Sequence, residues 1–148
     1  MFKQLCRTII FSLTFYTCLS LANPTETEFD QVQVQVNQQN FDLEYAKTFE
    51  QRAQGLMFRK KMCDSCGMLF KFEQARLAGM WMKNTFIPLD VAFIRADGTI
   101  TDIKAMQPHD MKTVSSSEPV LYAWEMNLAW FKQNNIKVGD KVTMSKAN

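Results

Sequence analysis

A pair of cysteines separated by two residues is the sharpest chemical feature of the sequence, Cys63-Asp64-Ser65-Cys66. Thiol oxidoreductases use this spacing, and thiolates also bind soft metal ions. In such an enzyme the first cysteine begins a helix, whose dipole lowers the thiol pKa. Here the second cysteine is followed at once by residues 67–72, an apolar run typical of a strand. We therefore expect a structural disulfide, with a redox-active pair and a metal site as alternatives.

Methionines suggest a second kind of chemistry. Met80 and Met82 flank Trp81, so a strand would place both thioethers on one face. Thioethers and thiolates suit Cu(I), and the cysteine pair, His109 and Met111 are the further candidate ligands. Methionine is also an adaptable core filler. We expect both strand methionines to point into the core, and hence no cofactor, with copper as the alternative.

The same alternation gives the other face of this strand a possible binding group. Trp81 and Lys83 share that face, Asn84 follows them, and Asp90 comes shortly afterwards. An indole platform beside an ammonium suits a polar or anionic small molecule. The alternative is structural, because asparagine and aspartate often stabilise turns through local hydrogen bonds.

Acid–base chemistry has weaker support. Asp90 and Glu125 are the pair that could serve a small hydrolase, although nothing in the sequence shows that they lie close together. His109 is the only histidine, which disfavours a zinc site or a Ser-His-Asp triad. The sequence also has no phosphate-binding loop, dinucleotide fingerprint or nucleophile elbow.

The N-terminus has the layout of a secretory signal peptide over residues 1–22. Lys3 and Arg7 precede an uncharged apolar stretch, and small residues lead to a cleavage site after Ala22. An uncleaved anchor helix is the alternative. A lipoprotein site at Cys18 is disfavoured because a bulky tyrosine precedes it.

Removal of this segment changes the charge. The full chain of 148 residues has 17 basic and 15 acidic residues, and the segment contains two of the basic ones, so the mature charge is zero. This balance disfavours nucleic acid as a partner. We expect a periplasmic or extracellular protein with no membrane span after cleavage, whose oxidising surroundings favour the disulfide.

The remaining chain predicts a flexible lead-in over 23–30 and one compact domain over 31–148. Hydrophobic residues make 47% and charged residues 22%, which are ordinary globular values. Thr48 and Gln51 form a capping box that starts a short helix, and Asn127 is expected to cap a second one ending near residue 134. Alternation and turn signals predict strands at 31–36, 41–45, 67–72, 79–83, 89–95, 99–106, 120–126 and 141–144. This pattern is mainly β, within the α+β class, and favours a small antiparallel barrel-like or sandwich domain.

Several motifs in order resemble domain-of-unknown-function family 192, a family of small, often exported bacterial and archaeal proteins. The motifs are residues 49–59, Gly67-Met68-Leu69-Phe70, Trp81-Met82-Lys83-Asn84-Thr85, Ile87-Pro88-Leu89-Asp90, Asp97-Gly98 and Gly139-Asp140. The resemblance covers about residues 41–142. The sequence departs from the family pattern at Leu128-Ala129-Trp130 and at the cysteine pair, which only some members have. The resemblance implies a compact β-rich fold and no activity, because the family has none established.

These observations favour an exported, non-catalytic binding or accessory domain of the bacterial cell envelope, whose partner is a small molecule or an envelope protein. The runner-up is a periplasmic thiol-redox or copper-handling protein, and the third hypothesis is the small hydrolase.

Overall fold

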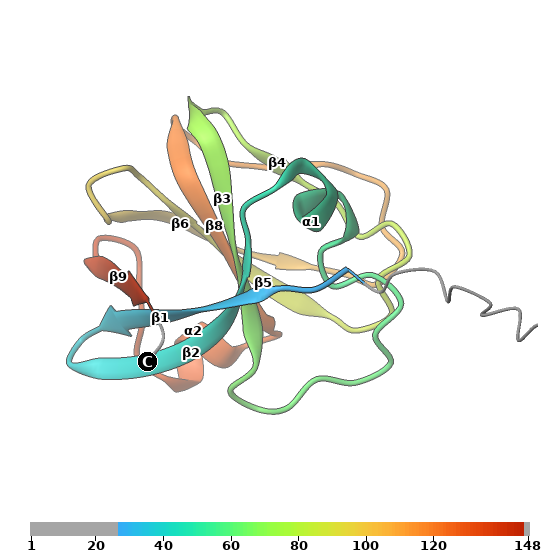
Figure 1. The fold of residues 1–148 in the computed structure, drawn as a ribbon, viewed down its shortest axis with the longest axis horizontal. Coiled ribbons are helices and arrows are strands. Elements are labelled where there is room, and N and C mark those ends of the chain that lie inside the picture. Colours follow the sequence, from blue (N-terminus) through green and yellow to red (C-terminus); the bar gives the residue numbers. More distant parts are fainter. Residues whose placement is uncertain (1–26, 147–148) are drawn as a thin grey trace, which may run out of the picture.

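The computed structural model describes residues 27–146, in which a curled sheet of seven strands forms a half-barrel (Figure 1). The strand order is β6-β5-β8-β3-β2-β1-β9, and β4 and β7 form a separate small sheet. All neighbouring strands are antiparallel except β2 and β3. The elements are β1 Asp30–Val36, β2 Gln39–Ala46, α1 Phe49–Gln54, β3 Gly67–Arg76, β4 Gly79–Met80, β5 Leu89–Ile94, β6 Ile100–Met106, β7 Val114–Ser115, β8 Val120–Asn127, α2 Trp130–Gln133 and β9 Val142–Lys146. The predicted mainly-β fold with two short helices is confirmed, whereas the predicted signal peptide lies outside the described residues.

Local sequence explains where most of these elements begin and end. The valines at every second position of β1 are buried, as its alternation predicts. The capping box of α1 is present: the Thr48 hydroxyl accepts from the Gln51 N–H, and the Gln51 side chain accepts from the Thr48 N–H. β3 is longer than predicted, because its polar second half rejoins β8 past an irregularity between Lys71 and Arg76.

Two predicted elements are shorter in the structure. The strand expected over 79–83 ends at Met80, because Lys83 and Asn84 form a turn in which Asn84 has a left-handed backbone (φ 53°). The second helix is confined to α2, whose N-cap is Ala129 rather than Asn127. Asn127 instead ends β8, and its amide donates to the carbonyl of Cys63 at 2.9 Å.

The sheet has a hydrophobic core on each face, because alternate residues of its central strands point to opposite sides. One core contains Leu69, Trp124 and Trp130, and it also includes residues of β1 and β9. The other contains Met68 and Phe70 and is covered by α1 and the segments that follow it. The candidate site lies on the second face.

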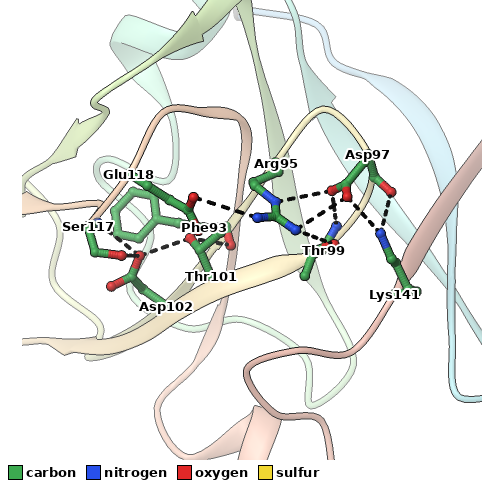
Figure 2. Close-up of polar contacts among 9 residues, drawn as sticks. All are labelled: Phe93, Arg95, Asp97, Thr99, Thr101, Asp102, Ser117, Glu118 and Lys141. Carbon is green, nitrogen blue, oxygen red and sulfur yellow. Dashed lines mark hydrogen bonds and ion pairs between the residues drawn. The ribbon is translucent and has the colours of Figure 1, made fainter.

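The two edges of the curled sheet meet at the turn before β6 and the start of β9. The Val142 N–H donates to the Gly98 carbonyl at 2.8 Å, and a Cβ at position 98 would lie 2.2 Å from the Val142 oxygen. Only glycine fits this contact. Figure 2 shows the polar side of the junction, where Asp97 accepts from Lys141 at 2.8 Å and pairs with Arg95. These charges lower the pKa of Asp97 well below its usual range.

A second polar group in Figure 2 ties the loop before β8 to β6. The Asp102 carboxylate accepts from the backbone N–H of Ser117 at 3.0 Å, from its hydroxyl at 2.8 Å and from the Thr101 hydroxyl at 2.9 Å. Burial acts to raise the pKa of Asp102, but these hydrogen bonds and the one from Lys104 outweigh it and lower that pKa to about 2. Every acceptor here is used within the fold, so we assign the group a structural role.

Candidate functional site

Glu125 is a buried acid that has no recorded partner among residues 27–146. It lies in β8 opposite Met68 and Val91, both buried and apolar, and is itself only 4% exposed. Within residues 27–146 the structure records no hydrogen bond or ion pair to its carboxyl group. Burial alone therefore raises the pKa of Glu125 to about 8. Most buried polar groups are hydrogen-bonded, so an unpartnered carboxyl marks a candidate site.

The Glu125 carboxyl faces a small chamber that adjoins a wider cleft. The chamber measures about 30 Å³, and its wall includes Thr85 and the segment 52–57. Phe70, Met80 and Trp81 line both spaces. The wider cleft measures about 220 Å³ and is further lined by Phe49, Arg52, Ala53, Phe72, Arg76 and Gly79. We call the two spaces together the α1 cleft.

Segments distant in the sequence build the α1 cleft. α1 and the turn after it form one wall, and this helix ends at Gly55, which has a left-handed backbone (φ 49°). A Cβ there would approach the Phe70 ring to 3.2 Å, so glycine lets the helix end pack closely on β3. The segment after β4 supplies the opposite wall. Figure 1 shows α1 and β4 at the same end of the molecule.

The backbone around Thr85 is held in unusual conformations. Phe58, Asn84 and His109 all have positive φ angles, at 65°, 53° and 61°. The Phe58 N–H donates to the Asn84 carbonyl at 2.8 Å, and the His109 N–H donates to the Thr85 carbonyl at 3.2 Å. A left-handed phenylalanine is rare and costs about 1 kcal/mol or more. Strained backbone conformations are found most often at functional sites. Here the two hydrogen bonds hold the segment around Thr85, which lines the chamber.

Two arginines line the α1 cleft, and only one is free for a ligand. The Arg52 guanidinium donates to the carbonyls of Lys47 at 2.6 Å and Lys71 at 3.1 Å and pairs with Glu73 at 3.3 Å. The Arg76 guanidinium lies 4.8 Å above the centre of the Phe72 ring. In the part of the chain that the structure describes, no carboxylate pairs with Arg76. The wider space of the α1 cleft therefore offers the Arg76 cation to a ligand.

The predicted orientation of residues 80–83 is confirmed, although the strand itself is shorter. Met82 is 2% exposed and Met80 is half-buried, and both pack in the second core. Trp81 is 48% exposed, and the Lys83 ammonium lies 5.4 Å from its ring centre. The structure therefore brings Trp81 and Lys83 together, as the sequence indicates, with Asn84 in the turn that follows.

Asp90 does not join Glu125, its predicted partner in the hydrolase hypothesis. It lies opposite Met126 and on the other face of the sheet from Glu125, whose neighbour in β5 is Val91. Its carboxylate accepts from the Ala129 N–H at 2.8 Å. Burial raises the pKa of Asp90, and this hydrogen bond partly offsets the effect. Asp90 therefore has a structural contact, but with a backbone N–H 39 positions away rather than through the expected local turn. The acid pair of the hydrolase hypothesis is not assembled.

Cys63 and Cys66 form a disulfide in a turn, with Cα atoms 5.1 Å apart, and no helix begins there. A bridged cysteine has no thiolate to offer a metal ion.

The remaining candidate copper ligands are in unlike surroundings. Met82 is buried, whereas Met111 is exposed and His109 is exposed with its ring 5.1 Å from that of Phe86. Among residues 27–146 no three histidine, cysteine, aspartate or glutamate side chains are grouped to hold a metal ion. Copper binding gains no support from these positions.

Sequence reasoning identified Glu125 but missed the cleft around it. The available signal was a single acid between Trp124 and Met126 in an otherwise apolar strand. The residues of α1 and Thr85 come close to Glu125 only through tertiary packing, which local sequence patterns do not predict.

The chain belongs to domain-of-unknown-function family 192, described as an uncharacterised ACR, whose match covers residues 32–144. A putative transcription regulator from Sinorhizobium meliloti is 36% identical with a TM-score of 0.74, and the match covers 81% of this chain and 98% of that one. A protein of unknown function from Novosphingobium aromaticivorans is 34% identical with a TM-score of 0.69, covering 76% and 83%. No curated protein matches the chain. Within the described residues, no helix is long and apolar enough to cross a membrane.

Proposed function

We propose that this protein is an exported, non-catalytic binding protein of the bacterial cell envelope that holds a small organic molecule in the α1 cleft. The observation that supports this most is the Glu125 carboxyl, which is 4% exposed, lines the smaller space of the α1 cleft and has no partner among residues 27–146. No protein group of the described chain pairs with this carboxyl, and it borders the chamber, so a ligand that enters the chamber can pair with it.

The composition of the α1 cleft favours binding over catalysis. Nucleophilic catalysis needs a nucleophile that is hydrogen-bonded to its base, whereas the Thr85 hydroxyl donates to the Lys83 carbonyl at 3.3 Å. Of the other chamber residues in the described chain, Arg52 alone is charged, and its guanidinium is bound to carbonyls and Glu73. The exposed Trp81 and half-buried Met80 instead provide the apolar walls that small-molecule sites use.

Filling the cleft is expected to abolish ligand capture. Ala53 is an exposed residue of α1 that lines both cleft spaces, so Ala53→Phe blocks the cleft without disturbing the core. Glu50→Phe is the matched control, because Glu50 is exposed on the same helix and does not line the cleft. Equilibrium dialysis against a small-molecule extract, read by mass spectrometry, should show compounds enriched by the wild type and the control but not by Ala53→Phe. Equal enrichment by all three proteins, or none, contradicts the proposal.

Export is expected to remove residues 1–22. The intact mass of the protein isolated from a bacterial envelope fraction should correspond to a chain that begins at Asn23. A protein that keeps Met1, or one acylated at Cys18, would contradict this part of the proposal.

A further inference from the structure

The closed end of the α1 cleft suits one small group with hydrogen-bond donors. The chamber of about 30 Å³ has room for a single water-sized group. Glu125 and Thr85 line this chamber with a carboxyl and a hydroxyl group. The Thr85 hydroxyl donates its proton to the Lys83 carbonyl at 3.3 Å. Thr85 is therefore left with an acceptor lone pair. A primary ammonium has three donors and a positive charge, and it satisfies both acceptors at once.

The open end of the cleft suits the opposite charge. Arg76 lies over the Phe72 ring with its guanidinium 4.8 Å from the ring centre. Within residues 27–146 it has no carboxylate partner. A guanidinium held over an aromatic face recognises planar anions such as a carboxylate through paired hydrogen bonds.

Between the two ends the cleft is apolar. Phe70, Met80 and Trp81 line both the chamber and the wider space, so a ligand that reaches from Arg76 to Glu125 passes along them. These side chains have no charge to pair with, and they favour a hydrocarbon segment.

We propose, resting on the proposed function above, that the α1 cleft binds a small zwitterion, with its amine in the Glu125 chamber, its carboxylate at Arg76 and a short hydrocarbon chain between them. An ammonium at the inner end favours the ionised form of the Glu125 carboxyl and pairs with it, whereas an anion there disfavours that form. A wholly neutral ligand would leave the Arg76 charge unused. Arg52 is the other charged residue of the chamber wall in the described chain, and its guanidinium is directed to carbonyls and Glu73.

Three probes of one chain length test the proposal by isothermal titration calorimetry with the purified protein. They are 6-aminohexanoate, hexylamine and hexanoate, of which only the first has both charges. We expect 6-aminohexanoate to bind at least tenfold more tightly than either of the others. Glu125→Gln should remove its advantage over hexanoate, and Arg76→Gln should remove its advantage over hexylamine.

Lys71→Gln is the matched control, because Lys71 is an exposed cation of the same strand that does not line the cleft. It should leave the order of the three affinities unchanged. Thermal melting of each variant shows that it is folded before titration. The proposal is overturned if hexanoate or hexylamine binds as tightly as 6-aminohexanoate, if either cleft variant keeps the preference, or if no probe binds. Ligand enrichment in the Ala53→Phe dialysis experiment with no probe binding refutes the zwitterion alone, whereas failure of both experiments refutes the binding function too.

Discussion

Replacing Glu125 with glutamine is expected to raise the free energy of unfolding at pH 8 and to change it little at pH 4. The folded-state pKa is about 8, above the ordinary value of 4.5, because burial disfavours the carboxylate. Between pH 4.5 and pH 8 the Glu125 carboxyl is ionised in the unfolded chain but keeps its proton in the folded chain. The free energy of unfolding of the wild type therefore falls as the pH rises. The full loss is about 5 kcal/mol, since each pKa unit corresponds to about 1.4 kcal/mol.

Urea unfolding of both proteins at pH 4, 6 and 8 measures this effect. Asp102 acts in the opposite direction, because its lowered pKa gives stability that is lost as the pH falls toward 2. Both proteins share that contribution, so the difference between them isolates Glu125. Parallel stability curves across this pH range would show that Glu125 is solvated or paired in solution.

Substituting Met82 with aspartate is expected to prevent folding. Met82 is 2% exposed among apolar side chains of the second core, and an aspartate there would bury an unpaired charge. Such a charge costs more than the 5–15 kcal/mol that a small domain has available, unless it takes up a proton. Circular dichroism should show loss of the cooperative thermal transition.

Lys83→Ala is the control for this substitution. Lys83 is an exposed neighbour whose recorded interaction is with the Trp81 ring at 5.4 Å, so its removal should change the melting temperature by only a few degrees. Equal tolerance of the two substitutions would contradict the observed orientation of this segment.

Local patterns predicted the elements that depend on local forces. Alternating valines identified β1, and the Thr48–Gln51 capping box identified the start of α1, because both signals act within a few residues. The predictions failed where tertiary contacts decide the outcome. Asn127 was expected to cap a helix, but its amide binds the Cys63 carbonyl, 64 positions earlier in the sequence.

The candidate site likewise contains some residues that local patterns could place and others that depend on tertiary contacts. The proximity of Trp81 and Lys83 agrees with the alternation read from the sequence, although the strand that the alternation predicted ends at Met80. The position of Asp90 could not be predicted, because its face depends on the register of β5 against β8, which a single sequence does not fix. The cleft depends on where α1 packs on β3, so the residues around Glu125 could be found only in the folded structure.

The pairing of β1 with β9 makes completion of the sheet depend on residues 142–146. Val32 lies opposite Lys146, so the first strand of the sheet is completed by the final one. Sheets built from such distant pairs have high contact order and fold in milliseconds to seconds, because a long loop must close before the pairing stabilises it. Because a polypeptide is synthesised from its N-terminus, this sheet cannot be completed until residue 146 has been made. Under the export that we propose, late completion keeps the chain extended while it crosses the membrane and allows it to fold once residue 146 is outside.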